Sequence, residues 1–188
     1  MAAVAIGVDP SMTATGVAWL DHTGAVSVRT IRTLSSAAPA RYREILNVLV
    51  PLVGQSPLHQ RPVTFLEDVH VQHVDAAKAL AGLHAVLEYA LWLRRVPYTF
   101  VHAVRVKVYA TGRGNADKAA MVQAATSLLG HTVQVRNDNE ADALWLLAMA
   151  ADWAGRPLVH LPPRQHDVLT RCAAPRRYPG SPTEDQHG

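Results

Sequence analysis

Three acidic residues at the ends of predicted elements are the part of this sequence that could do chemistry. Asp9 ends an apolar run and precedes a Pro-Ser turn, and Glu67 ends a second apolar run. Asp142 lies in a late, mostly apolar stretch with helical character. An isolated Asp before a turn usually only caps that turn, but three acids at such places favour a functional site.

These acids could meet at one edge of a sheet. Asp9 and Glu67 come together if their strands are neighbours that end at the same edge, and Asn139 and Asp142 share one face of a helix. Clustered carboxylates repel each other unless a cation neutralises them, and oxygen ligands select hard cations such as Mg²⁺ or Mn²⁺. Two such ions about 3.5–4 Å apart can activate a water and stabilise a leaving oxygen. The acids therefore predict metal-dependent phosphodiester hydrolysis.

The composition is that of an ordinary globular protein. The chain has 188 residues, of which 49% are hydrophobic and 18% charged, enough for one domain with a real core. Its net charge of +3 weakly favours a polyanionic partner. A single cysteine, Cys172, excludes an internal disulfide and predicts a reducing, cytoplasmic location. No run approaches the roughly 18 apolar residues that would predict a membrane span.

Apolar spacing, turn formers and caps predict the elements. Strands are expected over 3–8, 15–21, 25–32, 61–66 and 97–102, and helices over 39–53, 75–95, Asn115 (N-cap) to Gly130, and 139–153. The first three strands should form an antiparallel meander, and helical crossovers should add the last two, giving a mixed five-stranded α/β sheet. Residues 1–154 are expected to form one domain, followed by a mobile Pro/Arg-rich basic tail over 155–188.

Several segments carry a resemblance to a known family. They are Ile6–Ser11 continuing into Thr15–Ala18, Leu66–Val69, Val106–Gly112 with Asn115–Lys118, and Asn139–Leu144. The first resembles the opening motif of RuvC-type Holliday junction resolvases, of the ribonuclease H-like (retroviral integrase) superfamily. The second and last resemble their later acidic motifs, and the third their basic segment and following helix. Each motif alone is weakly specific, but four in order over roughly residues 4–153 are fairly specific.

The resemblance implies a fold and an activity. The fold would be a ribonuclease H-like mixed sheet flanked by helices. The activity would be that of a structure-selective endodeoxyribonuclease that resolves four-way DNA junctions by paired nicks, leaving 5′-phosphate and 3′-hydroxyl ends. It implies a homodimer, since symmetrical cleavage needs two active sites related by a two-fold axis. The helix at 75–95, with Leu91 and Trp92 expected to be exposed, is the predicted dimer contact.

The resemblance also implies roles for individual residues. Asp9, Glu67 and Asp142 would be metal-binding catalytic acids, and Lys107 and Lys118 would lie near the scissile phosphate or the junction backbone, with Lys118 counted among the catalytic residues.

Asn139 is a fourth predicted metal ligand and departs from the family pattern, because many relatives have Asp there and some have His. Its amide offers a carbonyl oxygen without charge, and Asp138 and Glu140 are the neighbouring acids that could compensate.

Other residues near these motifs have structural interpretations as well. Tyr109 and Arg113, beside a Gly-rich loop, are predicted DNA contacts; that loop lacks the Walker ending expected of a nucleotide cradle. Asp68 follows Glu67 and should face the opposite side of the sheet. Trp145 and Trp153 are predicted core residues. His70 and His73 lack the spacing of a zinc site.

Three alternatives remain at this stage. A nuclease of the same fold could act on flaps, replication forks or RNA–DNA hybrids. A non-catalytic protein could bind junctions without cutting them, and Asn139 favours that alternative. An actin-like kinase also opens with a strand-Asp-turn-strand motif, but the chain is too short for its duplicated domain. A branch-migration helicase partner is left open.

Overall fold

The computed structural model describes residues 3–54, 60–68 and 74–176. Its centre is a five-stranded sheet with the order β3-β2-β1-β4-β5. The strands are β1 (Ala3–Asp9), β2 (Ala14–Asp21), β3 (Val26–Arg32), β4 (Val63–Glu67) and β5 (Tyr98–Val101). Strands β1 to β3 pair antiparallel, whereas β4 runs parallel to both β1 and β5. The predicted meander with two added parallel strands is therefore confirmed.

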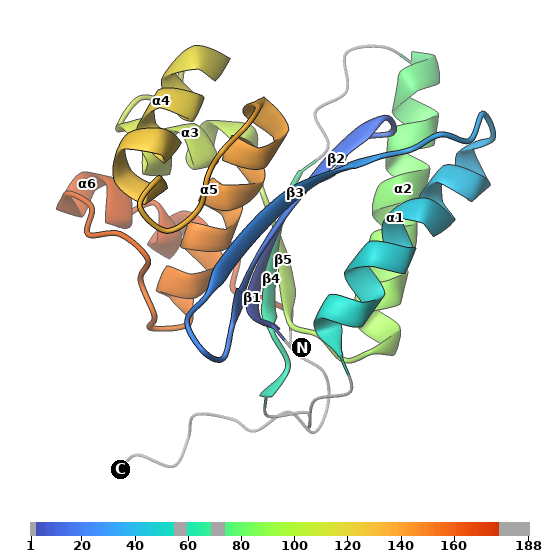
Figure 1. The fold of residues 1–188 in the computed structure, drawn as a ribbon, viewed down its shortest axis with the longest axis horizontal. Helices are drawn as coiled ribbons and strands as arrows, with labels where there is room; N and C mark the ends of the chain where they lie inside the picture. The colour runs from blue at the N-terminus through green and yellow to red at the C-terminus, as the bar shows by residue number, and fades with distance from the viewer. Residues whose placement is uncertain (1–2, 55–59, 69–73, 177–188) are drawn as a thin grey trace.

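Helices cover both faces of this sheet (Figure 1). One face carries α1 (Ala38–Val53) and α2 (Val74–Leu93), and the other carries α3 (Ala103–Thr111), α4 (Lys118–Leu129) and α5 (Asp138–Trp153). A short α6 (Pro163–His166) and a 3-10 turn, η2 (Leu169–Arg171), follow α5. Among the described helices, none combines the length and apolar character needed to cross a bilayer.

Helix α5 lies directly on the sheet because two glycines leave room for it. A Cβ added at Gly7 would stand 2.2 Å from the carbonyl oxygen of Ala143, and one at Gly16 would stand 2.0 Å from that of Asn139. Nearly all of α5 is buried, as its all-round apolar pattern predicted. Trp145 is fully buried and Trp153 packs against the same core, which confirms both expectations.

Helix α3 was not predicted from the sequence. Its valines alternate with polar residues, which is typical of a strand. In the structure the His102 side chain accepts a hydrogen bond from the Val104 N–H and caps the helix start, and Gly112 ends the helix at φ 75°. The following helix, α4, is capped by Asp117 instead of the predicted Asn115.

The C-terminal expectation also differs from the structure. Residues 156–176, which we define as the C-terminal strap, hold α6 and η2 and end in an antiparallel bridge between Arg176 and Tyr98 of β5. The strap is therefore folded against the domain instead of forming a mobile tail. Residues 177–188, the remainder of the expected tail, lie outside the described residues.

Candidate active site

Two of the three predicted acids end neighbouring strands. Val8 of β1 pairs with Leu66 of β4 in the parallel ladder, so Asp9 and Glu67 are the next residues on adjacent strands. Since parallel strands end at the same edge of a sheet, both carboxyl groups emerge on the same side of the molecule.

The turn after Asp9 is held by its own side chains. The Thr15 hydroxyl donates to the Ser11 carbonyl oxygen at 2.6 Å and accepts the Ser11 N–H at 3.1 Å. Thr15 is fully buried, so this turn is fixed against the core. The Ser and Thr of the opening motif therefore keep Asp9 at the strand end.

Asp142 comes from the second turn of α5, above the two glycines of the sheet. Burial raises the pKa of Asp9 well above its usual range, and the charges of Glu67 and Asp142 raise it further. Burial and then the Asp142 charge raise the pKa of Glu67 to about 7. Burial also raises the pKa of Asp142 to about 6, against the opposing charge of Lys118. In the structure the negative charges of the three acids therefore repel one another.

Two predicted cations face these acids. A cleft of about 190 Å³ is lined by Glu67, Ala103, Val106, Lys107, Lys118, Met121 and Asp142. Lys107 comes from α3, and Lys118, the first residue of α4, forms an ion pair with Asp138. The charges of Lys107 and Lys118 lower the pKa of both Glu67 and Asp142. The cleft therefore places carboxyl groups beside two lysine ammonium groups.

The donor set fits a hard divalent cation. The carboxyl groups of Asp9, Glu67 and Asp142 are partly buried, and their raised pKa values show that the nearby lysines do not fully offset the mutual repulsion of the acids. A bound divalent cation would stabilise the ionised form of this cluster. Among the described residues, no three His, Cys, Asp or Glu side chains are already close enough to enclose an ion. Such a site suits a hard divalent cation that keeps several waters and binds through a few carboxylates.

The residues beside Asn139 make separate contacts of their own. Asn139 is partly exposed and lies one turn before Asp142 on α5. Glu140 is buried and accepts the Arg136 N–H at 2.8 Å, while its own N–H donates to the Asn137 side chain at 3.0 Å. Asn137 therefore caps α5, while the Glu140 carboxylate binds the Arg136 N–H and is not among the residues that line the cleft. Asp138 is held by Lys118.

Tyr109 is not a DNA contact, contrary to the sequence prediction. It is fully buried, its hydroxyl donates to the Asp152 carboxylate at 2.8 Å, and its ring meets Trp145 edge-on. The helical spacing of Val106, Tyr109 and Ala110, all buried, is the signal that would have revealed this. Arg113 is exposed in the loop after α3 and stays a predicted DNA contact.

Asp68 faces away from the cleft, in agreement with the strand alternation. Its charge acts on His84 of α2, where it opposes the burial that lowers the pKa of that imidazole. The helix α2 lies on the other face of the sheet from α5. The histidines His70 and His73 lie outside the described residues.

Without divalent cations, the free energy of unfolding is expected to rise by about 2 kcal/mol as the pH falls from about 8 to about 5.5. The pKa values of Glu67, about 7, and Asp142, about 6, exceed the ordinary 4.5 and 3.8, so the folded chain binds protons that the unfolded chain does not. Urea unfolding in EDTA across this range measures the effect. The Glu67→Gln, Asp142→Asn double variant should reduce it and leave the part that Asp9 contributes, since burial raises the pKa of Asp9 as well. A wild-type stability that stays constant or falls would contradict the prediction.

Known proteins are similar to this chain in sequence. A model of the family described as "Crossover junction endodeoxyribonuclease RuvC" matches residues 5–150. The RuvC crossover junction endodeoxyribonuclease of Rhodococcus jostii (strain RHA1) is 30% identical over 152 residues, covering 79% of this chain and 80% of that protein. That of Nocardia farcinica (strain IFM 10152) is 28% identical over the same shares.

Among solved structures, the fold resembles that of T. thermophilus RuvC in complex with a Holliday junction substrate. The TM-score is 0.65 at 18% identity, and the match covers 82% of this chain and 97% of that one. A second structure of Thermus thermophilus RuvC gives a TM-score of 0.57 at 20% identity over 81% and 96% of the two chains. With the family match over most of the sequence, the chain belongs to the RuvC family of crossover junction endodeoxyribonucleases.

Proposed function

We propose that this chain resolves four-way DNA junctions by metal-dependent hydrolysis of one phosphodiester bond in each of two strands. The observation that carries the proposal is that the charges of Asp9, Glu67 and Asp142 act on one another beside a cleft lined by Glu67, Asp142, Lys107 and Lys118. The family match and the names of the relatives support the same activity.

In this proposal each residue type has a separate task. Asp9, Glu67 and Asp142, with the Asn139 amide oxygen, would hold Mg²⁺, for which Mn²⁺ could substitute. When bound, the ion supplies charge that stabilises the attacking and leaving oxygens. Lys107 and Lys118 bind the phosphate oxygens and orient the bond to be cut across the cleft, while Arg113 contacts the backbone nearby.

Product analysis tests the reaction. Water attack that breaks the bond between phosphorus and the 3′ oxygen leaves a 5′-phosphate and a 3′-hydroxyl. A DNA ligase should therefore reseal both nicks without prior treatment with kinase or phosphatase. Products that ligase seals only after phosphate has been added to the 5′ end or removed from the 3′ end would contradict the proposed hydrolysis.

Asn139→Asp is expected to lower the Mg²⁺ concentration for half-maximal cleavage by roughly tenfold. The added carboxylate charge should make the free energy of Mg²⁺ binding more favourable by about 1–2 kcal/mol. A Mg²⁺ titration of the cleavage rate measures this. Asn115→Asp, in an exposed loop residue, changes the net charge equally and should leave the titration unchanged. An unaltered Mg²⁺ requirement in Asn139→Asp would remove Asn139 from the proposed ligands.

We also propose that two copies of the chain associate through α2. Tyr89 and Trp92 stack at a centroid distance of 6.2 Å although they are 60% and 56% exposed, and Leu93 beside them is 53% exposed. Leu91, which was expected to share this surface, is only 8% exposed and packs in the core, so that expectation was wrong.

Trp92→Glu is expected to weaken self-association by about 100-fold, the cost of losing a central aromatic contact of about 2–3 kcal/mol. Sedimentation equilibrium measures the dissociation constant. Leu128→Glu changes an exposed apolar residue of α4, away from α2, and serves as the matched control. A wild-type chain that stays monomeric, or equal association of both variants, would rule out the α2 contact.

A further inference from the structure

A buried carboxylate far from the metal-binding acids joins three helices. Asp152, in the last turn of α5, has a side chain only 6% exposed. It accepts the Tyr109 hydroxyl of α3 at 2.8 Å and lies 3.2 Å from Nε2 of His166 in α6. An acid at a helix C-terminus opposes the helix dipole, so Asp152 does not serve the stability of α5 itself.

The hydrogen bond from Tyr109 has a fixed direction. Burial and the neighbouring Asp152 charge raise the pKa of Tyr109 far above its usual value, so the hydroxyl keeps its proton and donates. Its weaker contact, to the Ala148 carbonyl oxygen at 3.4 Å, also leads to α5. The side chain of Tyr109 therefore ties α3 to the end of α5.

The C-terminal strap also contacts the last turns of α3. Gln165 of the strap donates to the Tyr109 carbonyl oxygen at 2.8 Å, one of the carbonyls that a helix end leaves without an internal partner.

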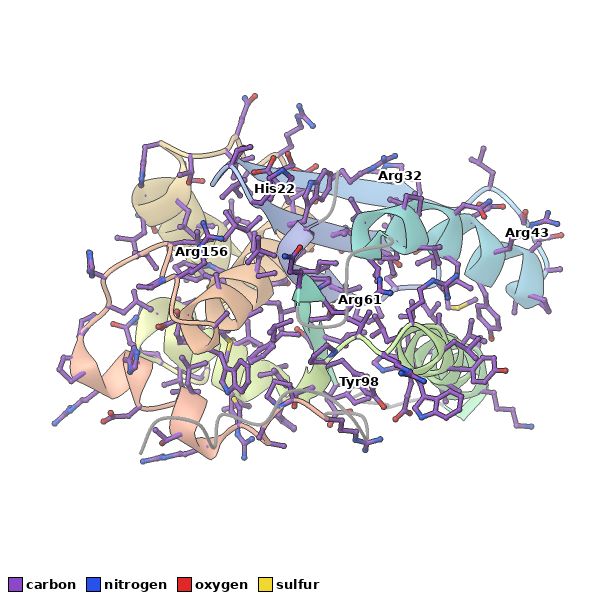
Figure 2. All side chains as sticks on the ribbon, turned by 90° about the horizontal axis from the view of Figure 1, so that it is seen from below. His22, Arg32, Arg43, Arg61, Tyr98 and Arg156 are labelled. Carbon is purple, nitrogen blue, oxygen red and sulfur yellow. The ribbon has the colours of Figure 1, made fainter. Side chains whose placement is uncertain are left out.

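Farther along, the strap is fastened to the edge of the sheet. The Ala173 carbonyl oxygen accepts the Thr99 hydroxyl at 3.0 Å, and the Arg176 N–H donates to the Tyr98 carbonyl oxygen at 2.8 Å. Arg176 also forms an ion pair with Glu88 of α2, and its guanidinium lies 5.6 Å from the centroid of the Tyr98 ring. Tyr98 is labelled in Figure 2. The strap is thus anchored on both helical layers.

The first half of α3 lines the active-site cleft, whereas Tyr109 lies near the end of the helix. Ala103, Val106 and Lys107 line the cleft, and the Lys107 charge reaches Glu67 and Asp142. Helix α3 has only nine residues, and helices this short depend on tertiary contacts for their position. The contacts that hold its C-terminal end therefore help to set the position of Lys107 in the cleft.

We propose that Asp152 is a positioning residue for cleavage: with the C-terminal strap it holds α3, and through α3 it places Lys107 in the cleft. The inference rests on the proposed function for the role of Lys107. The family match ends at residue 150, so Asp152 and the strap both lie beyond it.

The test is a mutant cycle in single-turnover cleavage of a four-way junction, well below the melting temperature of every variant. Asp152→Ala is expected to slow cleavage by about 10–100-fold, the effect of roughly an ångström of misplacement, with less than about threefold change in junction affinity. In the Asp152→Ala background, Lys107→Ala should cost much less than it does in the wild type. Asp167→Ala removes an exposed acid of the strap and should leave the rate unchanged.

If Asp152→Ala fails to fold, Tyr109→Phe tests the hydrogen bond between Tyr109 and Asp152 in its place, because it removes the hydroxyl and leaves no buried hydroxyl without a partner. It should slow cleavage in the same way, and amide hydrogen exchange over residues 103–111 should accelerate about tenfold in both variants. Independent, additive losses from Asp152→Ala and Lys107→Ala, or unchanged exchange in α3, would overturn the positioning role. A wild-type chain that cuts no junction would refute the proposed function instead.

Discussion

Asp9→Asn is expected to reduce junction cleavage by at least about 10³-fold while junction binding stays intact or tightens. Asp9 ends β1, which lies between β2 and β4 in the sheet, and the charges of Glu67 and Asp142 both act on it. The metal's charge stabilisation of the transition state is worth several kcal/mol, and each 1.4 kcal/mol is about tenfold in rate. Asn keeps the shape of the side chain but removes the charge that attracts the ion and repels the phosphate.

The same substitution should stabilise the chain in EDTA, because it removes one member of a repelling cluster. Single-turnover cleavage, gel-shift binding and thermal unfolding with and without Mg²⁺ measure the three effects. Asp68→Asn is the matched control, since Asp68 follows Glu67 directly but faces α2. It should change cleavage by less than about twofold. An Asp9→Asn chain that keeps more than a tenth of the wild-type rate would remove Asp9 from the catalytic site.

Gly7→Ala is expected to destabilise the fold by about 3 kcal/mol and to slow cleavage by about 100-fold in the molecules that remain folded. The new Cβ would lie 2.2 Å from two backbone atoms of α5, the Ala143 oxygen and the Leu147 nitrogen, and neither can turn aside. Helix α5 would have to move off the sheet, and Asp142 would move with it away from Asp9.

Urea unfolding and single-turnover cleavage separate the two effects. Gly24→Ala provides the comparison, because Gly24 has φ 90° and nothing within 4 Å of an added Cβ. It should cost about 1–2 kcal/mol through backbone strain alone and leave the cleavage rate of the folded chain unchanged. Equal rates for Gly7→Ala and the wild type would mean that the close helix–sheet contact does not place Asp142.

The sequence predicted best those elements that depend only on neighbouring residues, such as the strands. Apolar runs ending in turn formers predicted all five strands, and the strand-end positions of Asp9 and Glu67 predicted that the two acids would meet. Helix α3 was missed because its alternating valines are typical of a strand, and its helical form depends on the burial of Tyr109 against α5. Tyr109 was misassigned for the same reason.

Other features depend on distant parts of the chain. The need for glycine at position 7 comes from a helix more than 130 residues later, which no local pattern records. Glu140 could have compensated for Asn139 from its place beside it in the sequence, yet its carboxylate binds the Arg136 N–H. The strap lacks periodicity because single contacts, such as those of Gln165 and Arg176, hold it in place.

The measurement that tests the central claim most directly is cleavage of a mobile, labelled four-way junction beside linear duplex, flap, fork and RNA–DNA hybrid substrates, with Mg²⁺, Mn²⁺ or EDTA. Asp142→Asn serves as the inactive control. The account predicts symmetric paired nicks in the junction alone, abolished by EDTA and by Asp142→Asn. Tight junction binding without nicks under every metal condition would contradict it and identify a non-catalytic junction-binding protein. Cleavage of flaps, forks or hybrids in preference to junctions would contradict the proposed substrate.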